Sequence, residues 1–144
     1  MKTLFSIGMA ALLLGTVLSA DLVAAGKIEQ RLMKQGWVKL TVQELMALKD
    51  FTASDDFGWA EYIGPSGATV VTQYQNGTTK KGTREITADG QYCYLYRGEP
   101  TTVCRSLWKR GKYYAHVRSR GLGAAKRNIV RVQITIKPGN TQNL

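Results

Sequence analysis

The chain has few of the residues that build catalytic and metal sites. Its 144 residues include one histidine, His116, and two cysteines, Cys93 and Cys104. A metal site needs several spaced ligands, the haem-attachment motif C-x-x-C-H is absent, and no serine or cysteine lies in a recognisable nucleophile motif. We therefore expect no metal, no cofactor and no catalytic residue, and we interpret the protein as not an enzyme.

A hydrolase is the weaker alternative. Glu61 and Glu85 lie in segments with the pattern of strands, and two carboxyl groups can act as general acid and general base. Nothing in the sequence determines the distance between the two carboxyl groups. Charged side chains are also common at the solvent-facing positions of strands, so neither residue needs a catalytic role.

A long apolar stretch occurs at the N-terminus, from Leu4 to Leu18, after a positive charge at Lys2. This order predicts a secretory signal peptide over residues 1–25, cleaved after Ala25 or after Ala20. The stretch is shorter than the roughly 20 residues of a membrane span, and no cysteine near the cleavage site could carry a lipid anchor. We expect a periplasmic or secreted protein with no transmembrane span after cleavage and a single domain over residues 26–144.

Acidic residues are also scarce, at 10 against 20 lysines and arginines, which gives a net charge of +10. A basic exported domain is attracted to anionic lipid, polysaccharide or nucleic acid, although we find no motif for specific nucleic-acid binding. A surface that only keeps the protein in solution explains the composition equally well.

Both cysteines lie in an aromatic-rich stretch between Gly90 and Val117. A turn centred between Gly98 and Glu99 predicts a hairpin in which Cys93 faces Cys104. Because Pro100 has no N–H, the two cysteines are expected to form a non-hydrogen-bonded pair. The Cα atoms of such a pair lie roughly 4.5 Å apart, inside the disulfide range. The sequence therefore predicts a disulfide between Cys93 and Cys104, which fits an oxidising compartment.

A second turn, at residues 109–112, predicts a further hairpin in which Gly111 has a positive φ and Arg105 faces His116. The resulting three-stranded meander has two faces. The first is small or apolar and is expected in the core: Cys93, Leu95, Thr102, Cys104, Ser106, Trp108, Tyr113, Ala115 and Val117. The second, which we call the tyrosine face, carries Tyr92, Tyr94, Tyr96, Val103, Arg105, Leu107, Tyr114, His116 and Arg118.

Two interpretations of the tyrosine face stay open. Tyrosine and arginine neighbours stabilise an exposed sheet face by a few tenths of a kcal/mol to about 1 kcal/mol each. Alternatively, they line a groove or barrel mouth that holds an anionic or aromatic ligand. The candidate binding residues are Tyr92, Tyr94, Arg105, His116 and Arg118.

Helical spacing predicts one short helix over residues 27–35, and a capping box at Thr41 and Glu44 opens a second helix through about Lys49. The side chains that the second helix is expected to bury are Leu45, Met46 and Leu48. From residue 58 onward the apolar period is two, and an Asn76-Gly77 turn is the strongest hairpin signal.

Three basic side chains on the strand after that turn, Lys80, Lys81 and Arg84, are expected in solvent. The basic, glycine-containing loop at residues 118–127 resembles a phosphate-binding loop, but the segment after it has the pattern of a strand and not of a helix. In this last strand, over 129–137, the side chains expected to point inward are Val130, Val132, Ile134 and Ile136.

About seven antiparallel strands after two short helices indicate a mainly β fold. We predict an antiparallel meander that forms a small barrel or a strongly curved sheet.

The order of motifs also resembles a known family. The motifs are a helix with a Glu-Leu step, then Tyr62-x-x-Pro65-x-Gly67, Gly82-Thr83, Asp89-Gly90-x-Tyr92-Cys93, Cys104 and Gly111-x-Tyr113. This order, behind a signal peptide, resembles the small exported bacterial proteins of the domain of unknown function 995 family. The resemblance covers most of the chain after residue 25 and implies the fold and the exported location, but no activity.

From these observations we expect a non-catalytic binding module for an anionic or amphipathic component of the cell envelope. The alternative is a module for a protein partner, as an inhibitor or an envelope-assembly factor. The two differ in salt dependence, because attraction between exposed charges is screened by salt.

Overall fold

A computed structural model describes residues 26–118 and 129–144, so the predicted signal peptide and most of the basic loop lie outside the described residues. In the described part, nine strands form one sheet. The elements in chain order are α2 (Lys27–Lys34), β1 (Val38–Lys39), α3 (Val42–Ala47), β2 (Phe51–Ser54), β3 (Ala60–Ile63), β4 (Thr69–Gln73), β5 (Thr79–Ile86), β6 (Tyr92–Tyr96), β7 (Val103–Arg110), β8 (Tyr113–Arg118) and β9 (Ile129–Pro138).

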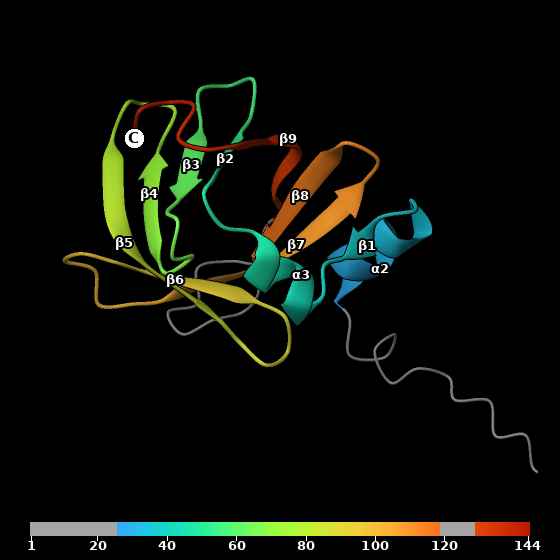
Figure 1. The fold of residues 1–144 in the computed structure, drawn as a ribbon. Helices are drawn as coiled ribbons and strands as arrows, with labels where there is room; N and C mark the ends of the chain where they lie inside the picture. Colours follow the sequence, from blue (N-terminus) through green and yellow to red (C-terminus); the bar gives the residue numbers. More distant parts are fainter. Residues whose placement is uncertain (1–25, 119–128) are drawn as a thin grey trace, which may run out of the picture.

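Strands β2 to β9 form a closed antiparallel barrel, which confirms the predicted mainly β fold (Figure 1). Each strand pairs with the next one along the chain, and the barrel closes because β2 also pairs with β9. Closure leaves no free edge among these strands, which is how up-and-down barrels avoid unwanted pairing. The sequence did not predict β2, which is short and lies between charged residues.

Strand β1 and helix α2 lie outside the barrel beside β7 and β8 (Figure 1). The first half of β7 pairs with β6, and β1 takes the place of β6 farther along, where Val38 pairs with Lys109. Helix α2 covers the outer face of this region, where Leu32 and Trp37 share an apolar cluster with Trp108. The wall of the barrel is therefore buried on both faces here.

Helix α3 supplies the barrel core with one side chain. The predicted capping box is confirmed, because the Thr41 hydroxyl accepts from the Glu44 N–H and the Glu44 carboxylate accepts from the Thr41 N–H. Leu45 is fully buried in the core cluster, whereas Met46 is 64% exposed. The prediction that Met46 is buried was wrong, because the helix ends at Ala47 and buries only one stripe of its surface.

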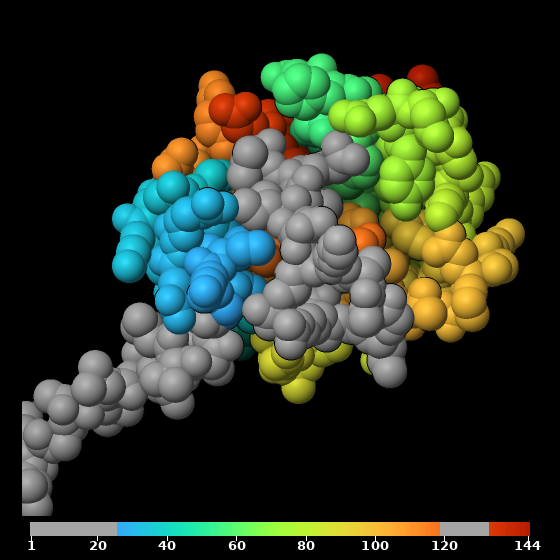
Figure 2. Space-filling view, turned by 180° about the vertical axis from the view of Figure 1, so that it is seen from behind, coloured from blue at the N-terminus to red at the C-terminus, as the bar shows by residue number. Residues whose placement is uncertain are grey.

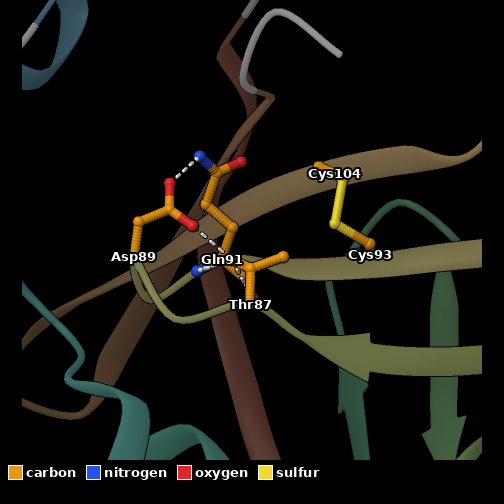
Figure 3. Close-up of a disulfide and its surroundings, with 5 residues drawn as sticks. All are labelled: Thr87, Asp89, Gln91, Cys93 and Cys104. Carbon is orange, nitrogen blue, oxygen red and sulfur yellow. Dashed lines mark hydrogen bonds between the residues drawn. A yellow bond between two sulfur atoms is a disulfide. The ribbon is translucent and has the colours of Figure 1, made fainter. Parts of the chain in front are cut away.

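The register of the β6–β7 hairpin is the predicted one. Cys93 is paired with Cys104, their Cα atoms are 4.0 Å apart, and the disulfide is formed. Figure 3 shows the disulfide beside the turn before β6, where the Asp89 carboxylate accepts from the side chains of Thr87 and Gln91. The hydrogen bonds of the turn therefore hold the chain just before β6, and the disulfide holds the start of β6 against β7.

The predicted register of the β7–β8 hairpin was wrong by two residues. Arg105 pairs with Arg118 and Leu107 pairs with His116, because the turn residues are Gly111 and Lys112. Gly111 has the expected positive φ, 59°. A shift of two residues keeps every side chain on its predicted face, since side chains alternate with period two.

The last strand shows the predicted inward positions only in part. Ile134 is buried in the core, and Ile136 packs against it. The register with β8 shifts along the strand, and Gln133 has a φ of 64°, as at a β-bulge. The side chains of residues 129–132, including Val130 and Val132, lie outside the described part.

We expect removal of the disulfide to weaken the domain. The bridge closes a short loop, with a sequence separation of 11, so Cys93→Ser/Cys104→Ser should lower the free energy of unfolding by about 2 to 3 kcal/mol. Urea unfolding of this variant and of the oxidised and reduced wild type would measure the effect. Equal urea midpoints for oxidised and reduced protein would contradict the expectation.

Candidate functional site

The tyrosine face is the inner surface of the barrel. Tyr92 and Tyr94 on β6, Arg105 on β7 and His116 on β8 are all buried, whereas Arg118 at the end of β8 is half-buried. The prediction that the opposite face forms the core needs correction, because the main core contains the tyrosines. On the opposite face, α2 covers the apolar side chains of Trp108, Ala115 and Val117, and Cys93 and Ser106 are also buried, whereas Leu95 is exposed.

The barrel brings four of the five candidate residues together. The Tyr92 and His116 rings are 5.6 Å apart, and the Arg105 guanidinium lies 5.7 Å from the centre of the Tyr94 ring. The interior of an eight-stranded barrel is just wide enough for side chains to fill it, so these large groups occupy the space themselves. Neither an exposed sheet face nor an open groove describes their surroundings.

Glu61 on β3 is the acceptor at the centre of this interior. The Tyr94 hydroxyl donates a hydrogen bond to one carboxylate oxygen. The Thr72 hydroxyl donates to the other at 3.3 Å, and the Arg105 Nη1 lies 3.7 Å from that same oxygen. With 2% of Glu61 and 4% of Arg105 exposed, this is a buried ion pair inside a hydrogen-bonded network.

Burial governs the protonation of this network. It raises the pKa of Glu61, while Arg105 and the hydrogen bonds from Tyr94 and Thr72 act in the opposite direction. Burial also raises the pKa of Tyr92 and Tyr94 well above the usual value, so both phenols keep their protons. For Arg105, burial disfavours the charge, but Glu61 and the three tyrosines Tyr92, Tyr94 and Tyr96 together outweigh burial and raise the pKa.

Arg84 on β5 is a buried residue that the sequence prediction placed in solvent. Its guanidinium donates to the carbonyl oxygens of Leu45 and Leu48, both at 2.9 Å, and to that of Gly67 at 3.3 Å. It therefore ties the last turn of α3 and the β3–β4 turn to the barrel wall. The sequence did contain a signal, because Arg84 shares a strand face with Ile86, which packs against the core.

The interior leaves little space for a ligand. A cavity of about 10 Å³ is lined by polar groups of Glu61, Arg84, Tyr92 and His116 among apolar side chains. This is roughly the space that one water molecule needs. A binding site at the predicted residues would therefore require the barrel to rearrange.

The structure does not bring Glu61 and Glu85 together as a general acid and a general base. Glu61 points into the barrel, whereas Glu85 on β5 is exposed.

Among the described residues, no group of three or more His, Cys, Asp or Glu side chains is placed to hold a metal ion. Within residues 26–118 and 129–144, no helix is long and apolar enough to cross a membrane.

A larger hollow lies on the outer surface, where β1 meets the end of β7. This basic groove of about 350 Å³ is lined by Gly36, Val38, Lys39, Leu40, Glu44, Lys109, Arg110 and Gly111. Figure 2 shows the α2 and β1 segments, in blue and cyan, at the same edge of the molecule as the orange β7–β8 turn. The sequence prediction missed the groove because its walls come from segments far apart in the chain.

Two cations of the basic groove are held in place by neighbours. Arg110 lies 4.8 Å from the centre of the Trp37 ring and donates to the Gln35 carbonyl oxygen at 3.1 Å. Lys39 donates to the Asp89 carbonyl oxygen at 3.0 Å. The Glu44 carboxylate in the groove accepts hydrogen bonds from Thr41 and keeps its negative charge, but it is outnumbered by the three cations Lys39, Lys109 and Arg110.

Comparison with known proteins returned no match: no family model, no curated protein and no solved structure matches this chain.

Proposed function

We propose that this protein is a non-catalytic binding module that holds an anionic or amphipathic component of the cell envelope in the basic groove. The groove carries the proposal, because its volume lies within the roughly 300 to 1,000 Å³ of ligand sites and its rim is cationic. Lys39, Lys109 and Arg110 can pair with acidic groups, while Val38, which is 68% exposed, offers apolar contact.

The location in the envelope is part of the same proposal. A disulfide between Cys93 and Cys104 persists in oxidising compartments and favours export, as does the signal peptide that the sequence predicts. The resemblance to exported proteins of the domain of unknown function 995 family supports the same location. The tyrosine face enters the proposal as the scaffold of the barrel and no longer as the binding surface.

The test is a thermal-shift series on the oxidised domain with anionic lipids, glycans and nucleotides. A ligand at 100 times its Kd should raise the midpoint by about 10 °C, because binding to the native state stabilises it. In Lys109→Ala the shift should shrink, because the groove loses a cation, whereas Lys81→Ala removes an exposed cation from β5 and should leave the shift unchanged.

If the ligand-induced midpoint shift fell equally in Lys109→Ala and Lys81→Ala, binding would depend on net charge alone, and the groove would not be the binding site. A panel without any shift would contradict the anionic ligand and favour a protein partner, which a pull-down from envelope extract would then identify.

A further inference from the structure

The cations of the basic groove continue onto the β7–β8 turn. We call the four exposed side chains Lys39, Lys109, Arg110 and Lys112 the basic tip. Three of them lie within four residues of the chain, and Lys39 joins them because β1 pairs with β7 at Trp108 and Lys109. In the described part of the chain, the close ion pairs join Lys80 to Glu99 and Arg105 to Glu61. The carboxylates of Glu44 and Asp89 attract Lys109 and Lys39 from farther away, so the basic tip keeps an excess of positive charge.

Apolar and aromatic groups lie directly beside these charges. Val38 is the ladder partner of Lys109, and Tyr113, which is 37% exposed, is the ladder partner of Arg110. The Lys112 ammonium lies 5.2 Å from the centre of the Tyr113 ring. Exposed cations next to an aliphatic and an amphipathic aromatic side chain match the layered chemistry of a membrane–water interface.

We propose that the basic tip docks the protein onto the surface of a bilayer that contains anionic lipids, an inference that rests on the proposed function and specifies its ligand. Lipid phosphates would surround the end of the hairpin, with Lys109 and Val38 on one face of the sheet and Lys39, Arg110 and Tyr113 on the other. Each lysine or arginine near such a surface contributes about a fivefold gain in binding. The basic tip fits a lipid surface better than a single small anion, because the charges of the tip extend beyond the groove onto the β7–β8 turn.

The experiment is co-sedimentation of the oxidised protein with vesicles of phosphatidylglycerol and phosphatidylcholine, and with vesicles of phosphatidylcholine alone. We expect binding to the anionic vesicles only, weakening as salt rises. Lys109→Gln/Lys112→Gln should lower the partition coefficient about 25-fold, because two cations are lost. Val38→Ser, which leaves the net charge unchanged, should also weaken binding, and this loss distinguishes apolar contact with the surface from charge alone.

The matched control is Lys81→Gln/Arg97→Gln, which removes the same charge. These two exposed residues also adjoin each other, since the Arg97 N–H donates to the Lys81 carbonyl oxygen at 2.9 Å. Lys81 lies on β5 and Arg97 lies in the β6–β7 turn, which is at the opposite end of β7 from the basic tip. We expect less than a threefold change, and an equal loss in both pairs would overturn the docking proposal.

A parallel measurement with soluble dextran sulfate separates the two proposals. Binding to dextran sulfate that depends on Lys109, without binding to vesicles, would overturn membrane docking and leave the basic groove as an anion site. Binding to neither probe would overturn both.

Discussion

Arg105→Met is expected to lower the free energy of unfolding by about 3 to 5 kcal/mol at pH 8, because it leaves the buried Glu61 carboxylate without its cation. Burial already raises the pKa of Glu61, and the loss of Arg105 removes the main opposing influence. The native state of the variant therefore takes up a proton more readily than the unfolded chain does.

The sign of the pH dependence follows from this raised pKa. Below the usual carboxyl pKa both states carry the proton, and Glu61 imposes no charge penalty on the variant. As the pH rises through the folded-state pKa, the native state must hold a buried charge, and stability is lost. The deficit of Arg105→Met should therefore be largest at pH 8 and smaller at pH 5.

Glu61→Gln gives the complementary result. Arg105 keeps its charge across this pH range, so the deficit of Glu61→Gln should not recover at pH 5. The double variant Glu61→Gln/Arg105→Met should be less destabilised than the two single losses added together, since no uncompensated charge remains. Arg97→Met, at an exposed position, is the control and should change stability by less than about 0.5 kcal/mol.

Urea unfolding at pH 5, 7 and 8 with the disulfide intact would measure these differences. A deficit for Arg105→Met that is independent of pH, or strictly additive single losses, would show that the ion pair is not coupled as described.

Leu45→Ala should cost about 3 to 5 kcal/mol, because Leu45 is fully buried in the barrel core and its truncation leaves a cavity. The neighbouring Met46→Ala is a matched control on the same helix and should stay within about 0.5 kcal/mol, since Met46 is exposed. Thermal or urea unfolding of both variants would show whether α3 belongs to the barrel core. Similar losses in the two variants would contradict that placement.

Some features of the fold were predictable from local chemistry. The turn centred between Gly98 and Glu99 placed Cys93 opposite Cys104, as observed. The capping box at Thr41 and Glu44 marked the start of α3. In each case a few neighbouring residues determine the geometry, so the sequence contains the whole argument.

Other features depend on contacts between distant segments. Phe51–Ser54 forms a strand because it lies between β3 and β9, and four residues beside charged neighbours give no periodic signal of their own. The tyrosine face looked like an outer surface because it is polar, yet Glu61 from another strand supplies the acceptor that lets Arg105 and Tyr94 be buried. Likewise, the basic groove exists only once β1 has paired with β7.

The pairing of β2 with β9, which closes the barrel, is also expected to form last during folding. The hairpins of the meander join neighbours in the chain and can form early, whereas the pairing of Thr52 with Lys137 must wait until the rest of the barrel has formed. Until then, β2 and β9 are open edges whose unpaired N–H and C=O groups can add strands from other molecules. The newly synthesised chain is therefore most prone to aggregate in the interval before this last ladder closes.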